Sequence, residues 1–159
     1  MARYLVTVCS HGRLPIFGQI VEGKMRASAI GAIVEEEWNR TAQLRFGVLL
    51  DAFVLMPNHL HGIVILNLAD DLAAGDIPRT GGLAAPSRGI GAIMSGFKAA
   101  VSSAIANQEL GVSGPMWQRG FHDRSIRDER ELQQFREYIA NNALQWELDG
   151  YFEQEIGGR

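Results

Sequence analysis

The alternation of hydrophobic and polar positions predicts strands and helices in the first part of the chain. Tyr4 to Cys9 is rich in β-branched and aromatic residues and is expected to form a strand. A weaker extended stretch covers Gln19 to Arg26. Apolar residues then recur at helical spacing, which predicts an amphipathic helix from Ser28 to about Leu44. We expect the acidic residues Glu35 to Glu37 on the solvated face of this helix.

Two apolar stretches fill Val48 to Leu66 and are interrupted only by Pro57 and Asn58. This pair suits a tight turn, so the stretches are predicted to pair as an antiparallel hairpin. We expect the hairpin to form the centre of the sheet. Residues 67–87 are rich in Asp, Gly and Pro and are expected to form a flexible loop.

The second half of the chain contains two further amphipathic helices, predicted at Ile90 to Ile105 and from about Asp128 to Asn142. Between them, Trp117 to Ile126 suits an edge strand or an irregular extended segment. The resulting order of strand, helix, hairpin, helix, strand and helix predicts an α+β sandwich around a central antiparallel sheet. We expect residues 1–159 to form one domain, since 47% of the side chains are hydrophobic and 21% are charged.

Composition excludes several classes of function. The formal net charge of -3 differs from the strongly basic balance of proteins that coat nucleic acid. The single cysteine, Cys9, excludes an internal disulfide and a multi-cysteine zinc site, and we expect it to be a core residue. We find no export signal, membrane span, Walker loop or dinucleotide-binding glycine motif, so a cytoplasmic location is expected.

The segment from Met56 to Leu66 carries the first candidate site. Because side chains two apart on a strand project from the same face, His59 and His61 can converge on one metal ion while Leu60 faces the opposite side. A metal site needs a third ligand and open positions for substrate. The alternative is that the two histidines pack together without a metal.

The last helix offers the groups that such a site lacks. Tyr138 and Asn142 are four residues apart and therefore share one face of the helix, at the border of its apolar stripe. A tyrosine can act as a covalent nucleophile on a phosphoryl group that a metal polarises. Alternatively, Tyr138 is a residue at the edge of the core and Asn142 caps the C-terminus of the helix.

Three segments resemble the single-tyrosine HUH transposases, and within them the REP-associated tyrosine transposases. They are FVLMPNHLHGIV (Phe53 to Val64), SGFKAAVS (Ser95 to Ser102) and MWQRGFHDRSIRDERELQQFREYIANN (Met116 to Asn142). The resemblance covers nearly the whole chain and implies a ferredoxin-like fold. Relatives often carry a histidine where this chain has Arg124 and an aromatic residue where it has His122, so any role at these two positions is left open.

The resemblance also implies metal-dependent cleavage and joining of single-stranded DNA through a 5′-phosphotyrosine intermediate, without ATP. In this scheme Tyr138 is the nucleophile, and His59, His61 and Asn142 are ligands of Mg²⁺ or Mn²⁺. The implied partner is single-stranded or hairpin DNA. The protein is then a monomer, or a homodimer in which the tyrosine helix serves the partner's histidines.

DNA binding of this kind requires positive charge against phosphates and aromatic faces against bases. The candidate residues are Lys98, Trp117, Arg119, Arg124 and Arg127. The alternative is that the arginines pair with nearby acidic residues on a solvated face. We expect Trp38 and Trp146 to be packing residues rather than platforms for base stacking.

Two other functions remain open. The first is a nucleic-acid-binding module that has this fold without catalytic turnover. The second is an unrelated metallohydrolase built on His59 and His61, for which Asp51 or His122 would be the nearest further ligand.

Overall fold

A computed structural model describes residues 1–67, 89–112 and 114–146 of the chain, and the loop predicted at 67–87 lies almost wholly outside these ranges. The elements in chain order are β1 (Ala2–Cys9), a 3-10 turn η1 (His11–Arg13), β2 (Gly18–Val21), β3 (Lys24–Ala27), α1 (Ala29–Leu44), β4 (Val48–Met56), β5 (His59–Leu66), α3 (Ile90–Asn107), β6 (His122–Ser125) and α4 (Glu129–Asn141). Every helix predicted from the sequence within the described residues is present.

The main sheet has four strands in the order β4-β5-β1-β6, and every neighbouring pair is antiparallel. Counted along the chain, this is the order 2-3-1-4, the topology of a ferredoxin-like sandwich. The expectation that the whole hairpin forms the centre of the sheet is wrong for β4, which lies at an edge. The N-terminal strand β1 takes the second central position, because it pairs along the other side of β5. The weaker stretch at Gln19 to Arg26 forms a separate two-stranded hairpin, β2-β3.

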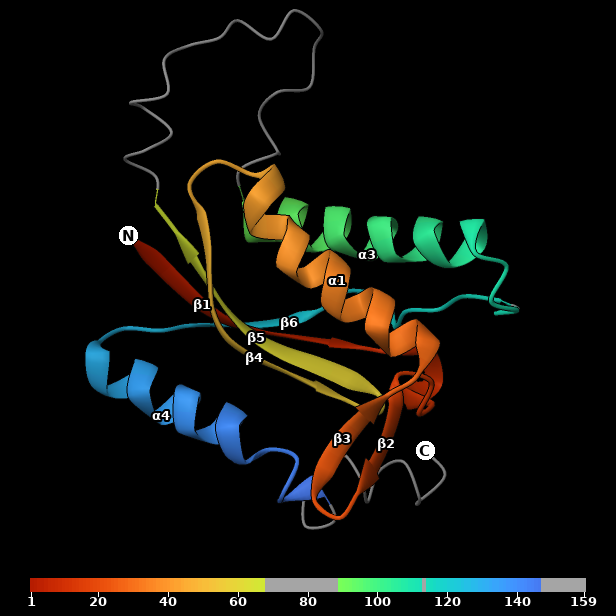
Figure 1. Cartoon of the computed structure of the whole chain (residues 1–159). Helices are drawn as coiled ribbons and strands as arrows, with labels where there is room; N and C mark the ends of the chain where they lie inside the picture. Colours follow the sequence, from red (N-terminus) through yellow and green to blue (C-terminus); the bar gives the residue numbers. More distant parts are fainter. Residues whose placement is uncertain (68–88, 113, 147–159) are drawn as a thin grey trace, which may run out of the picture.

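The helices form two layers, one on each face of the sheet. Figure 1 shows α1 and α3 together above the sheet and α4 alone below it. The side chains of β5 alternate accordingly: Leu60 and Val64 join the core under α1 and α3, whereas Ile63 joins a smaller core with Leu132 and Ile139 of α4. Odd-numbered residues of β5, including His59 and His61, therefore face α4.

Trp38 of α1 fixes the packing of the larger core. Its side chain is fully buried and packs against Phe97 of α3, with the two rings edge to face at 5.3 Å between centroids. It lies directly over Gly62 of β5, where an added Cβ would come within 2.3 Å of the indole ring. Trp38 is thus a packing residue, as predicted.

The prediction that the three acidic residues of α1 are all solvated is wrong for Glu37. Glu37 is buried, with 8% of its surface exposed, and pairs with Arg40 at 3.0 Å. The reason is its position four residues after Ile33, which places it beside the apolar stripe of the helix. Within the described ranges, none of the helices has the length and apolar character needed to cross a membrane.

Candidate active site

The two histidines lie side by side on the face of β5 that α4 covers. His59 is completely buried and His61 is 3% exposed. Their ring centroids are 4.6 Å apart, with an angle of 72° between the planes. The strand alternation predicted this shared face, and the fold brings the two rings into direct contact.

One nitrogen of each ring is held by a neighbouring side chain. His61 Nδ1 lies 2.7 Å from Thr7 Oγ1, which belongs to the directly opposite residue of β1. His59 Nδ1 lies 2.6 Å from Asn58 Oδ1. Asn58 Nδ2 donates to the backbone oxygen of Arg13 at 3.3 Å, which orients the amide with its oxygen toward His59. Because an amide oxygen only accepts, His59 Nδ1 is the donor and His59 Nε2 carries the lone pair.

Burial keeps both rings neutral near pH 7. It lowers the pKa of His61 from 6.5 to about 4. Burial also holds the pKa of His59 well below its usual value, and His61 in its protonated form and the positive charge of Arg13 act in the same direction. A polar interaction with the Asn142 side chain opposes this shift. Neutral imidazole is the form that binds a metal ion.

Helix α4 brings Tyr138 and Asn142 to the histidine pair. The Tyr138 hydroxyl lies 3.5 Å from His61 Nε2, and the two ring centroids are 5.4 Å apart. Tyr138 is 37% exposed, whereas Asn142 is buried. Asn142 also caps the helix, as the alternative interpretation held, through its backbone N–H to the Ile139 oxygen.

An ion pair attaches α4 to the edge of the sheet beside the tyrosine. Arg136 donates from Nε to Asp51 Oδ1 at 2.9 Å and from Nη2 to Asp51 Oδ2 at 2.5 Å. These hydrogen bonds lower the pKa of the Asp51 carboxyl group. Asp51, named above as a ligand for an unrelated metallohydrolase, is therefore already paired with Arg136. His122, the other candidate, is exposed on β6, with Thr7 of β1 between it and His61.

Sequence reasoning missed the role of Trp146 at the site. The indole is 7% exposed, which confirms its prediction as a packing residue. It packs on the site itself, stacked on the His59 ring at 6.1 Å with an angle of 26° between the planes. The sequence contained a signal for this contact, since Trp146 follows the predicted ligand Asn142 by four residues. Thr7 and Asn58 were also missed, and for Thr7 only the strand register identifies the contact.

The donor atoms fit a divalent metal ion. Two imidazole nitrogens and one amide oxygen, all on buried side chains, form a mixed set that suits Mn²⁺ and is compatible with Mg²⁺. Within residues 1–67, 89–112 and 114–146, no three His, Cys, Asp or Glu side chains are grouped to hold a metal. A site at this position would therefore depend on the Asn142 oxygen as its third protein ligand.

Two of the predicted DNA-binding residues, Lys98 and Trp117, have structural contacts. Lys98 Nζ donates to the backbone oxygens of Gln118 and Gly120 at 2.9 and 2.8 Å, and burial lowers the pKa of this ammonium group. The Trp117 indole donates to the Lys98 oxygen at 3.2 Å, and its ring packs against Phe17. These two residues shape the loop that carries Arg119.

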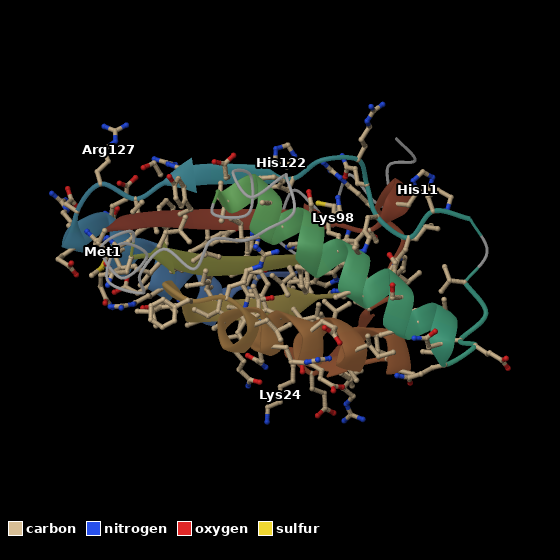
Figure 2. The ribbon with its side chains drawn as sticks, turned by 90° about the horizontal axis from the view of Figure 1, so that it is seen from above. Met1, His11, Lys24, Lys98, His122 and Arg127 are labelled. Carbon is tan, nitrogen blue, oxygen red and sulfur yellow. The ribbon has the colours of Figure 1, made fainter. Side chains whose placement is uncertain are left out.

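The three predicted arginines are exposed but differ in their contacts. Arg124 pairs with Glu131 at 3.3 Å and lies over the Phe135 ring, so the alternative of an ion pair on a solvated face applies to it. The Arg127 side chain points away from the body of the molecule (Figure 2). Arg119 lines a cleft of about 660 Å³ at the end of the sheet.

Comparisons with known proteins bear on the family and the fold of the chain. No protein-family model matches the chain. An uncharacterised protein of Haemophilus influenzae is 36% identical over 155 residues, which cover 92% of this chain and 82% of the relative. Among solved structures, a REP-associated tyrosine transposase bound to a REP hairpin matches with a TM-score of 0.62 and 15% identity, over 94% of this chain and 69% of that chain. The chain therefore belongs to the same family as the H. influenzae protein and has the fold of the REP-associated tyrosine transposases.

Proposed function

We propose that this protein is a metal-dependent single-strand DNA endonuclease and strand transferase whose nucleophile is Tyr138. The observation that carries the proposal is the 3.5 Å distance between the Tyr138 hydroxyl and Nε2 of the buried His61. A phenol at this distance from a paired-histidine site is positioned to react with a phosphate bound there. The shared fold with a REP-associated tyrosine transposase supports the same conclusion.

In the proposed reaction the Tyr138 oxygen attacks a DNA phosphorus atom. The bond between phosphorus and the 3′ oxygen breaks, and the 3′ oxygen takes up a proton from solvent, which leaves a 5′-phosphotyrosine and a free 3′-hydroxyl group. The phenolic proton leaves to solvent, to which Tyr138 is open. In the joining step a 3′-hydroxyl group attacks the phosphotyrosine and releases the tyrosine. Since one phosphodiester replaces another, no ATP is needed.

His59, His61 and Asn142 would hold the Mg²⁺ or Mn²⁺ ion. When bound, such an ion polarises a phosphoryl oxygen and offsets the negative charge that develops on it. Burial keeps both imidazoles neutral. Thr7 holds Nδ1 of His61 and Asn58 holds Nδ1 of His59, so that both rings are oriented before an ion binds. Trp146 shields His59 from solvent on one side.

Several contacts support the use of each chain's own tyrosine. Helix α4 packs on its own sheet through Leu132 and Ile139, and its N-terminal end is tied to β1 by the ion pair between Arg3 and Glu129. With the pair between Arg136 and Asp51, the helix is tied to the sheet by two ion pairs in the part that precedes Tyr138. We therefore expect a monomer to be sufficient for cleavage.

The proposed substrate is single-stranded DNA next to a hairpin. The solved transposase with this fold is bound to a REP hairpin. In this chain, Arg119, Arg124 and Arg127 are the proposed phosphate contacts, of which Arg124 would have to exchange Glu131 for a phosphate. We also propose that the protein acts in the bacterial cytoplasm.

The experiment is a covalent-adduct assay. End-labelled single-stranded oligonucleotides that carry the palindromes flanking the gene are incubated with protein and Mn²⁺ and separated on a denaturing gel. We expect a protein–DNA adduct that Tyr138→Phe abolishes and that His59→Ala, His61→Ala or EDTA prevents. Tyr4→Phe is the matched control, because Tyr4 packs in the core on the opposite face of the sheet.

The same assay separates the alternatives. An adduct that persists in Tyr138→Phe would refute the nucleophile. Metal-dependent hydrolysis without any adduct, unchanged in Tyr138→Phe, would instead support a metallohydrolase. Hairpin binding without cleavage in either Mg²⁺ or Mn²⁺ would support a non-catalytic binding module.

A further inference from the structure

The cleft that Arg119 lines is separate from the histidine pair, and neither His59 nor His61 lines it. Its walls come from two segments that are far apart in the chain, the η1 turn and the loop before β6. The lining residues are His11, Gly12, Arg13, Pro115, Trp117, Gln118 and Arg119. Two arginines and a histidine face this space, and none of the described residues that line it is acidic. Its volume of about 660 Å³ falls in the range of pockets that hold small ligands.

Both walls of the cleft are held in place by hydrogen bonds. His11 N donates to the Met116 oxygen at 2.8 Å, and Gln118 N donates to the Cys9 oxygen at 2.9 Å. The Lys98 ammonium group bridges the Gln118 and Gly120 oxygens on the far side of the loop. The cleft therefore needs little rearrangement to accept a ligand, which favours binding.

The η1 turn has an unusual backbone. Gly12 and Arg13 are consecutive residues in the left-handed region, with φ of 64° and 55°. This conformation is uncommon for a side chain as large as arginine, and it persists only where the surrounding structure holds it. Here the Arg13 oxygen accepts from Asn58 Nδ2, and Ser10 Oγ donates to the Leu14 oxygen at 2.7 Å.

The same contacts connect the cleft to the active site. Asn58, which binds the Arg13 backbone, also orients the His59 ring through its side-chain oxygen. A ligand that contacts Arg13 would thus be connected to His59 through a single residue, Asn58.

We propose that this cleft binds the phosphodiester backbone of the unpaired DNA segment that adjoins the scissile phosphate, with His11, Arg13 and Arg119 as its phosphate contacts. The inference rests on the proposed function for the identity of the strand. Cationic side chains beside an aromatic ring are the combination with which proteins bind single strands. The Trp117 ring, packed against Phe17 and Phe97, forms a fixed wall of the cleft.

The cleft also accounts for an otherwise unassigned part of the positive charge. Figure 2 shows His11, His122 and Arg127 along the same long edge of the molecule, the edge formed by β6, while Lys24 lies at the opposite edge. A strand that leaves the histidines through the cleft would continue past Arg124 and Arg127 at this edge. Binding at this edge would be sensitive to salt.

The test measures binding without cleavage. Fluorescence anisotropy is recorded in EDTA with Tyr138→Phe protein and two labelled DNAs, a hairpin with a single-stranded extension and the same hairpin with blunt ends. We expect His11→Ala and Arg119→Ala each to weaken binding of the extended hairpin on the order of tenfold. Binding of the blunt hairpin should be unchanged. Arg119→Ala should also reduce the slope of log Kd against the logarithm of the salt concentration by about 1, which corresponds to the loss of one phosphate contact.

Arg26→Ala is the matched control, since Arg26 is an exposed arginine on β3 in the separate hairpin. Equal affinity of wild type and both cleft variants for the extended hairpin would overturn the inference, as would an equal loss in Arg26→Ala. The outcome is independent of catalysis. If the protein forms no covalent adduct but Arg119→Ala still weakens extension-dependent binding, the proposed function fails and the cleft remains a single-strand site. If the adduct forms and the cleft variants bind normally, only the cleft inference fails.

Discussion

Replacing Gly62 by alanine tests the orientation of the strand that carries the histidines. Gly62 is the residue after His61 in β5 and faces the opposite layer, under Trp38. A Cβ at this position would lie 2.3 Å from Cζ2 and 2.8 Å from Cη2 of the indole. The indole cannot move aside easily, because it is fully buried between Phe53 and Phe97. We therefore expect Gly62→Ala to destabilise the protein.

The magnitude follows from two opposing contributions. In an open strand position, alanine would stabilise by ~0.5–1 kcal/mol relative to glycine, because glycine loses more backbone entropy on folding. Extra volume in a packed core costs ~1–3 kcal/mol, and sometimes more. For contacts as short as these at Gly62 the steric cost is the larger, and we expect a net loss of about 1–2 kcal/mol. In a domain of this size that loss lowers the Tm by about 2–8 °C.

The assay is thermal unfolding, with Gly91→Ala in helix α3 as the control. A Cβ at Gly91 meets nothing within 4 Å, so this variant should be as stable as the wild type or more stable, by up to ~1 kcal/mol. A Tm of Gly62→Ala at or above that of wild type would refute the reasoning. It would mean that Gly62 does not face Trp38. Because neighbouring residues of a strand point to opposite faces, His61 would then not face Tyr138.

Two further predictions concern the ring of His61. Thr7→Val should weaken Mn²⁺ binding, measured by isothermal titration calorimetry, on the order of 10–100-fold, whereas Thr7→Ser should restore it, because the hydroxyl group holds His61 Nδ1. Equal Mn²⁺ affinity in Thr7→Val and wild type would contradict this role. In metal-free protein in EDTA, His61 alone should contribute a loss of ~3 kcal/mol of unfolding free energy between pH 6.5 and 4, since burial lowers the pKa of His61 to about 4 and the unfolded chain binds the proton first. Urea titrations should show a smaller loss in His61→Gln, and an equal loss would exclude His61 as its source.

The face of each histidine could be predicted from the sequence because strand alternation is a local property. The pattern around Leu60 requires only that β5 has one apolar face, and it placed His59 and His61 on the other side. The same reasoning put Tyr138 and Asn142 on one side of their helix. Both predictions involve residues that are at most four apart in the chain.

Contacts between distant segments could not be predicted in the same way. Thr7 meets His61 only because β1 pairs along β5 with the register that it has, and Asp51 meets Arg136 across 85 residues of chain. Glu37 was misplaced for a different reason. Its charge was given more weight than its helical position beside Ile33, although an arginine one turn later allows it to be buried.

The net charge of -3 describes the average of the chain and says little about the proposed DNA path. His11, Arg13 and Arg119 share one cleft, and Arg127 extends from the same edge, while Asp51 of β4, beside the tyrosine helix, is paired with Arg136. A strand bound in this cleft meets two arginines and a histidine, and none of the described residues that line it is acidic. The molecule as a whole still repels extended duplex DNA, and recognition must therefore depend on this edge and on the histidine site.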